Sequence, residues 1–175
     1  WFRKTFTLTE SLKEALIYVA SIGYHELYVN GCKIGNAVLA PSVTDHKSRA
    51  RYVTYDISHY LKKGENVIAL WLGTSWAVFP AYQRNDKPAI PMALAQAEIT
   101  LTSGSKVRVI TDGSWKTHAS PNVLMGYWDA HHFAGEFYDA SLEINGWNEA
   151  GFDDSEWAEA KVYQPQIMVS ADKAE

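Results

Sequence analysis

Apolar and polar residues alternate along much of this chain with the period of two that is typical of β-strands. The alternation is clear in "WFRKTFTL" at 1–8, in "EALIYVASIG" at 14–23 and in "ELYVNGCKIG" at 26–35. In the last segment, Asn30-Gly31 predicts a type I′ hairpin turn, because both residues tolerate a positive φ. Cys32 follows this turn, and its strand context predicts a small buried hydrophobe.

The middle of the chain carries the strongest core signal. "NVIALWLG" at 66–73 is an unbroken apolar run and predicts a central strand that is buried on both faces. It follows the alternating segment "RYVTYDIS" at 51–58, and "ISHYLKKGEN" between them predicts a single helical turn that ends at Gly64. Residues 92–118 predict a meander, with a turn at Ser103-Gly104 and a third short strand from Trp115.

Two stretches lose this pattern and are rich in aromatic residues. They are "TSWAVFPAYQRNDKPAIP" at 74–91 and "SPNVLMGYWDAHHFAGEFYDASLE" at 120–143. Long loops inside a compact domain are more often functional than idle, so any site is expected there.

The elements together predict an all-β fold, an antiparallel β-sandwich with jelly-roll topology, because about ten short strands are separated by turn signals and helical periodicity is almost absent. Residues 1–165 are predicted to form one domain. Residues 166–175 are predicted to be a C-terminal strand and, in "SADKAE", the start of a linker to a downstream domain. The chain begins without Met inside a strand pattern, so we expect a piece of a longer protein.

Composition narrows the function classes. A chain of 175 residues with 47% hydrophobic content suits one core, and a net charge of −4 with scattered Lys and Arg gives no footprint for nucleic acid. No apolar run approaches the roughly 20 residues of a membrane-spanning helix, so no membrane partner is expected. A single cysteine excludes an intrachain disulfide and a thiolate metal cluster. The compartment stays open, with a secreted or periplasmic location favoured over a cytoplasmic one.

Several motifs together resemble the N-terminal β-sandwich domain of bacterial α-L-rhamnosidases. In chain order they are "APSVTD" at 40–45, "YVTYDI" at 52–57, "KKGENVI" at 62–68, "TDGSWK" at 111–116, "GEFYDA" at 135–140 and "GWNEAGFDDSEW" at 146–157. The resemblance implies a galactose-binding-domain-like jelly roll that serves as an accessory domain before a catalytic α-helical barrel in a larger glycoside hydrolase. The catalytic carboxylates belong to that barrel. This chain alone is therefore expected to be non-catalytic, with the downstream catalytic domain as its partner.

The resemblance also implies a carbohydrate partner, L-rhamnose-containing glycans. In some members of the family this sandwich holds L-rhamnose with the help of a calcium ion, through an Asp followed by an Asn in a loop. The nearest match here is Asp45-His46, in which histidine lacks the hard amide oxygen that calcium prefers. Asp45 is therefore the candidate calcium ligand.

Sugar binding needs an aromatic face for stacking and side chains for directional hydrogen bonds. The first loop supplies Trp76, Tyr82 and Asn85, and the second supplies Trp128. Together with the Asp45-His46 pair, these residues are the candidate carbohydrate site. An alternative for Trp76 is that it folds back and caps the sandwich.

The second loop has an alternative of its own. Tyr127, Trp128 and Phe133 could form an apolar patch that faces the catalytic domain. In that case the chain is a purely structural docking module that binds no sugar.

The acidic residues offer no clear catalytic pair. Asp153-Asp154 in "FDDSEW" is expected to cap a turn and to remain solvated. Glu136 and Asp139 flank Tyr138, which predicts a hydrogen-bond network at a strand end.

The histidines offer no clear metal site. His131 and His132 are adjacent, so in a strand they point to opposite faces and cannot easily share a zinc ion. His25, His59 and His118 are isolated and are expected at the surface or the edge of the core.

Overall fold

The computed structural model describes residues 1–45, 48–73, 91–125, 135–163 and 167–174, and these residues form thirteen strands. In chain order the elements are β1 (Phe2–Leu8), β2 (Leu12–Ile22), β3 (Tyr24–Val29), β4 (Cys32–Ile34), β5 (Arg49–Asp56), β6 (Gly64–Gly73), β7 (Met92–Leu101), β8 (Lys106–Ile110), β9 (Lys116–Thr117), β10 (Asn122–Met125), β11 (Gly135–Tyr138), the 3-10 turn η3 (Ala140–Leu142), β12 (Ala158–Glu159) and β13 (Met168–Ala174).

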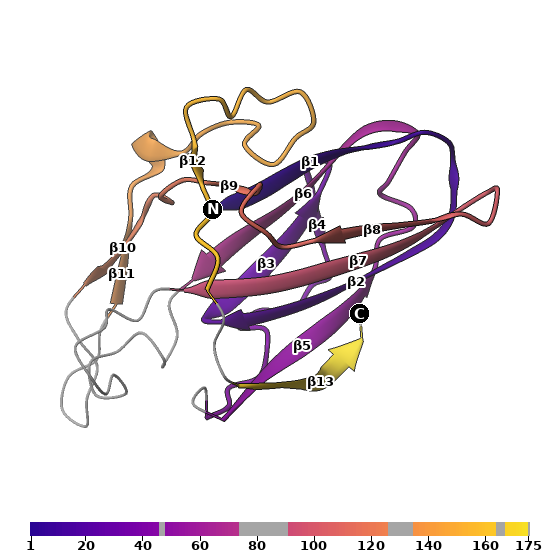
Figure 1. Cartoon of the computed structure of the whole chain (residues 1–175). Coiled ribbons are helices and arrows are strands. Elements are labelled where there is room, and N and C mark those ends of the chain that lie inside the picture. The colour runs from indigo at the N-terminus through magenta and orange to yellow at the C-terminus, as the bar shows by residue number, and fades with distance from the viewer. Residues whose placement is uncertain (46–47, 74–90, 126–134, 164–166, 175) are drawn as a thin grey trace.

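The strands form two large sheets that enclose one core, as Figure 1 shows. One sheet has the order β12-β9-β1-β6-β3-β4 and the other the order β13-β5-β2-β7-β8, while β10 and β11 form a separate two-stranded sheet. Neighbouring strands run antiparallel, except that β13 pairs with β5 in parallel. This arrangement confirms the predicted all-β sandwich. Jelly-roll connectivity stays a prediction.

The core follows from alternation, because successive side chains of a strand point to opposite faces. On β2, Ala15, Ile17 and Val19 are buried in the core between the sheets. The prediction for "NVIALWLG" is confirmed: on β6, Ile68 and Leu70 join this core, whereas Ala69 belongs to a second cluster on the opposite face.

The second cluster covers the outer face of the six-stranded sheet. Trp1, Trp147 and Trp157 form its centre with Ala69, and Trp71 of β6 packs against it. The ring centroids of Trp1 and Trp147 lie 4.9 Å apart in a stacked arrangement. Such aromatic pairs add about 0.5–1.5 kcal/mol beyond the area that they bury.

The predicted hairpin is present, with φ values of 49° at Asn30 and 84° at Gly31. The Asn30 side chain also bonds to the neighbouring strand, because its Oδ1 accepts the N–H of Val67 at 2.9 Å and its Nδ2 donates to Asn66 Oδ1 at 2.9 Å. The prediction for Cys32 is wrong. This thiol is exposed, because β4 is a short edge strand on which only Ile34 is buried.

Three other segments differ from the sequence-based predictions. Residues 58–60 form a hydrogen-bonded turn rather than a helical one, and Gly64, with φ 95°, begins β6. The third strand of the predicted meander, β9, pairs with β1 and β12 of the opposite sheet, so the chain changes sheets after β8. "SADKA" of the predicted linker start is part of β13.

Candidate functional site

Asp45 lies in an exposed loop that joins β4 to β5. The Asp45 carbonyl accepts the N–H groups of Ser48 and Arg49, each at 2.9 Å, and its carboxylate accepts the Ser48 hydroxyl at 3.0 Å. The hydroxyl of Thr44 donates to the Arg49 carbonyl at 2.6 Å. These local bonds hold the loop in a closed turn, which is what short polar side chains favour outside regular structure.

Asp172 of β13 anchors the start of this loop. Its carboxylate accepts the Ser42 N–H at 2.8 Å, the Ser42 hydroxyl at 3.0 Å and Arg51 Nη1 at 3.0 Å. Burial by itself raises the pKa of this carboxyl, but the hydrogen bonds from Ser42 and the Arg51 charge outweigh burial and hold the pKa below its ordinary value. The loop is therefore fixed to the C-terminal strand through a charged group.

A calcium ion at Asp45 would need about six to eight oxygen ligands. The described part of the loop brings one carboxylate, that of Asp45, and its carbonyl already accepts two N–H groups. No group of three or more His, Cys, Asp or Glu that could hold a metal occurs among the described residues. The described part of the loop therefore supplies fewer oxygen ligands than a calcium ion needs. A role for Asp45 as a calcium ligand stays a prediction.

His25 lies under the start of the Asp45 loop. Its Nδ1 is 2.8 Å from the Ser21 hydroxyl and its Nε2 is 3.0 Å from the Tyr55 hydroxyl, while its N–H donates to the Ala40 carbonyl at 2.8 Å. His25 is only 4% exposed, so the predicted position at the surface or edge is wrong for this histidine. Polar partners on both ring nitrogens make its burial possible.

Most of the predicted sugar-contacting residues lie outside the described residues. They are His46, Trp76, Tyr82, Asn85 and Trp128. The alternative docking residues Tyr127 and Phe133, and the pair His131-His132, lie outside them as well. Their assignment to a carbohydrate site or a docking patch stays a prediction.

The carboxylates around β11 are held in local networks. Tyr138 donates to Glu143 Oε2 at 2.7 Å, and this hydrogen bond to a carboxylate raises the pKa of the tyrosine. Asp139 caps η3 by accepting the Ser141 N–H at 2.9 Å, and Glu136 accepts Asn122 Nδ2 at 3.2 Å. Hydrogen bonds are therefore present at this strand end as predicted, but Tyr138 donates to Glu143 and not to Glu136 or Asp139.

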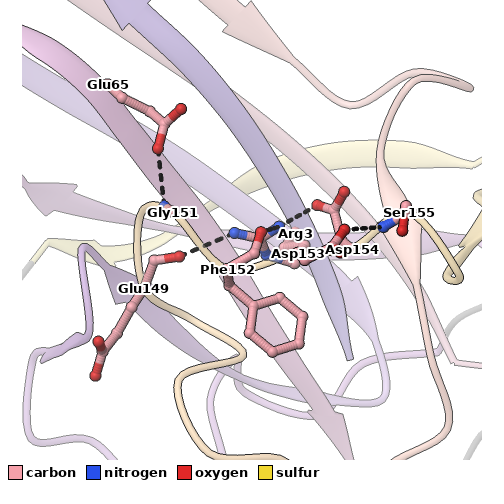
Figure 2. A network of polar contacts seen from close by, with 8 residues as sticks. All are labelled: Arg3, Glu65, Glu149, Gly151, Phe152, Asp153, Asp154 and Ser155. Atoms are coloured by element: carbon pink, nitrogen blue, oxygen red, sulfur yellow. Dashed lines mark hydrogen bonds and ion pairs between the residues drawn. The ribbon is translucent and has the colours of Figure 1, made fainter.

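The pair Asp153-Asp154 divides into two structural roles, which Figure 2 shows. Asp153 accepts the Ser155 N–H at 3.0 Å and stabilises a turn, as predicted. Asp154 instead forms an ion pair with Arg3 of β1, whose side chain is 1% exposed. The prediction that both acids stay solvated is wrong for Asp154, because this carboxylate is paired with a buried arginine.

Arg3 has further partners in the same loop. Its Nη2 donates to the Glu149 carbonyl at 2.9 Å, its Nη1 to the Phe152 carbonyl at 3.4 Å, and its guanidinium carbon lies 5.2 Å from the centre of the Phe152 ring. In Figure 2 the guanidinium lies within the arc of this loop, and Gly151 N–H donates to Glu65 Oε1 at 2.8 Å beside it. These contacts of Arg3 join β1 to the loop at 149–154 and have a structural role.

A shallow hollow of about 280 Å³ lies on the outer face of the five-stranded sheet, and sequence reasoning did not identify it. Its lining residues come from four strands: Tyr18, Ala20, Tyr52, Leu94, Gln96 and Val169. The sequence does carry a sign of this hollow in "ALIYVAS", where apolar residues occupy the outward as well as the inward positions of the strand. β2 therefore has an apolar outer face as well as an apolar inner one.

The sequence model that describes the α-L-rhamnosidase N-terminal domain matches residues 10–175. An α-L-rhamnosidase of Formosa agariphila is 30% identical over 174 residues, which cover 95% of this chain and 18% of that protein. An α-L-rhamnosidase of Streptomyces avermitilis is 31% identical over 153 residues, which cover 85% of this chain and 14% of that protein. The chain therefore spans less than a fifth of the length of these relatives.

Solved structures agree. The α-L-rhamnosidase from Dictyoglumus thermophilum superposes with a TM-score of 0.82 at 37% identity, over 94% of this chain and 17% of that one. The Streptomyces avermitilis α-L-rhamnosidase complexed with L-rhamnose superposes with a TM-score of 0.82 at 28% identity, over 95% of this chain and 16% of that one. A Pleurotus ostreatus lectin, at 21% identity and a TM-score of 0.55, shares the fold alone and covers 94% of this chain and 36% of its own. This chain belongs to the α-L-rhamnosidase N-terminal domain family.

Proposed function

We propose that this chain is a non-catalytic accessory domain of an α-L-rhamnosidase-like glycoside hydrolase, which packs against the rest of the polypeptide and binds L-rhamnose-containing glycans weakly. The observation that carries the proposal is coverage: the match extends over 95% of this chain but only 18% of the Formosa enzyme. Most of such an enzyme, including the part that carries its chemistry, lies elsewhere in the polypeptide.

The acidic residues of this chain support the non-catalytic part of the proposal. Glycoside hydrolysis usually takes two carboxyl groups about 5–9.5 Å apart across the scissile bond. Asp139 and Asp153 are held as turn caps, and Asp154 is paired with a buried arginine. Each of these groups has a structural partner that explains it without a substrate.

Deletion of this domain from the longer polypeptide tests the accessory role. We expect the shortened protein, when it is folded by circular dichroism, to keep most of its turnover number on a small aryl α-L-rhamnoside and to lose thermal stability. A folded shortened protein without turnover would contradict the proposal, because it would mean that this domain contributes a group to the reaction.

Weak sugar binding is supported by the Streptomyces relative, whose structure is a complex with L-rhamnose, and by the polar loop at Asp45. Calorimetric titration of the chain with L-rhamnose, with and without calcium, tests it. We expect weak binding heat that Trp76→Ala abolishes and that Ser103→Ala, in the β7–β8 turn, leaves unchanged. Heat equal to buffer dilution in both titrations would remove sugar binding and leave a purely structural docking module.

A further inference from the structure

We propose that the outer face of the five-stranded sheet is the surface on which the next domain of the longer polypeptide docks; this rests on the proposed accessory function and names the face that serves it. Figure 1 places β13, β5, β2 and β7 side by side in this sheet. The docking surface is defined by the residues around the hollow: Tyr18, Ala20, Tyr52, Leu94 and Val169.

The hollow follows from the strand register. Leu94 of β7, Ala20 of β2, Tyr52 of β5 and Ala171 of β13 are direct partners across four strands. Small alanines therefore alternate with large side chains along one row, and Ala20 is only 4% exposed although it points away from the main core. Tyr18 and Tyr52 meet edge to face with centroids 5.7 Å apart, and their rings form an aromatic wall of the hollow.

The surface around the hollow is apolar with a polar rim. Leu94 is 51% exposed and Val169 is 41% exposed, and Leu16 and Ile110 add exposed apolar area on the same face of β2 and β8. Glu98, which pairs with Arg108 at 2.6 Å, lies at the rim. An apolar centre with polar groups around it is the usual anatomy of a protein interface, and exposed patches of this kind mark interaction sites.

The two outer faces of the sandwich differ in this respect. The outer face of the six-stranded sheet is covered by the tryptophan cluster of Trp1, Trp147 and Trp157. No comparable cluster covers the outer face of the five-stranded sheet in the parts of the chain that the structure describes. Among the described residues, tryptophans cover the outer face of one sheet, and apolar side chains on the outer face of the other sheet stay exposed.

The following domain is the occupant that the chain geometry favours. The matched family is described as an N-terminal domain, and the chain spans 18% of the Formosa enzyme, so most of such a polypeptide lies outside this domain. β13, the last described strand, is the edge strand of this same sheet, and its Val169 lines the hollow. A polypeptide that continues from β13 therefore starts beside the docking surface.

A sugar fits this surface less well. Besides the tyrosines, the hollow offers one polar side chain, Gln96, whose Nε2 already donates to Glu98 Oε1 at 2.7 Å. Sugar sites need several directional hydrogen-bond partners, whereas a protein surface can fill an apolar hollow with its own side chains.

Cysteine labelling tests the proposal. In a Cys32→Ser background, Leu94→Cys reports on the docking surface and Ser103→Cys, in the exposed turn between β7 and β8, is the matched control. We expect both to react with a maleimide at similar rates in the 175-residue chain. In the longer polypeptide we expect Leu94→Cys to react at least about tenfold more slowly than the control, which corresponds to roughly 1.4 kcal/mol in favour of the docked state.

Equal rates for the two cysteines in the longer polypeptide would overturn the proposal. Protection of Leu94→Cys that grows with the concentration of the 175-residue chain would assign the surface to a second copy instead, and protection by L-rhamnose would assign it to sugar. Failure of the docking proposal would leave the accessory role intact, because that role is tested separately by the turnover of the shortened enzyme. As a second variant, Leu94→Asp should lower the melting temperature of the longer polypeptide but not that of this chain.

Discussion

Replacement of Arg3 by methionine should destabilise the domain strongly, because Arg3 is a buried cation with several partners in one loop. Methionine keeps the length and the apolar stem of the side chain, so packing against Phe152 is largely preserved. The change removes the partner of Asp154 and the donor to the Glu149 carbonyl.

The magnitude follows from burial. Removal of one partner from a buried ion pair costs about 3–5 kcal/mol, because a charge stays behind without its counter-ion. Asp154 is 23% exposed and can regain some water, so the lower end applies and we expect a loss of about 3 kcal/mol. For a domain of this size that lowers the melting temperature by roughly 6–12 °C.

Urea denaturation followed by tryptophan fluorescence measures the loss, with an unchanged m-value as the check that the denatured state is the same. Arg108→Met is the matched control, because Arg108 also pairs with a carboxylate, that of Glu98, but is 63% exposed. Exposed ion pairs contribute little, so this variant should unfold near the urea concentration of the unmodified chain. Equal shifts for the two variants would refute the argument that burial of Arg3 decides its contribution.

Three further predictions concern other parts of the fold. Gly23→Ala should destabilise the folded domain by about 2 kcal/mol in urea titrations, because the φ of Gly23 is 106° and a Cβ would lie 2.6 Å from the Gly73 carbonyl oxygen. Gly113→Ala, whose Cβ would meet nothing closer than 3.8 Å, should be near neutral, and equal effects of the two variants would contradict this reasoning. Asp172→Asn should lower stability at neutral pH and lose this difference as the pH falls below about 4, because the folded pKa of Asp172 lies below its unfolded value; a difference that persists at low pH would rule out the charge as its cause. Cys32 should react with Ellman's reagent in the native chain as fast as in urea, and slow native reaction would contradict its exposure.

The sequence predicted the strands well where one face had to be buried. Burial alternates from Ala15 to Val19 on β2 and from Leu94 to Leu101 on β7, and a shift of one residue would turn Ile17 or Ile99 out of the core, so period two was a sufficient guide there. The Asn30-Gly31 turn was predictable because few other pairs tolerate both positive φ values. These features are local, and local chemistry decides them.

Features that depend on distant contacts were not predictable in the same way. Arg3 occupies an alternating position that looks solvent-facing, yet the loop around Glu149 and Asp154 closes over it from almost the other end of the chain. His25 is buried because Ser21 and Tyr55 satisfy its ring nitrogens, and a single sequence carries no signal for such a pairing.

The candidate site divides in the same manner. A sequence motif points to Asp45, and in the structure the Asp45 carboxylate accepts the Ser48 hydroxyl at 3.0 Å. The hollow at Tyr18 and Leu94 is not predictable from alternation within single strands, because it depends on which outward residues of β2 and β7 become neighbours across the sheet.

The proposed function is that this chain serves a glycoside hydrolase without carrying out its reaction. The direct measurement is release of the aryl group from an aryl α-L-rhamnoside by the purified 175-residue chain, followed over days at high protein concentration beside the longer polypeptide. We expect release at the buffer rate for the chain and rapid turnover for the longer polypeptide. Turnover by the chain that scales with its concentration, and that copurifies with it, would contradict the account.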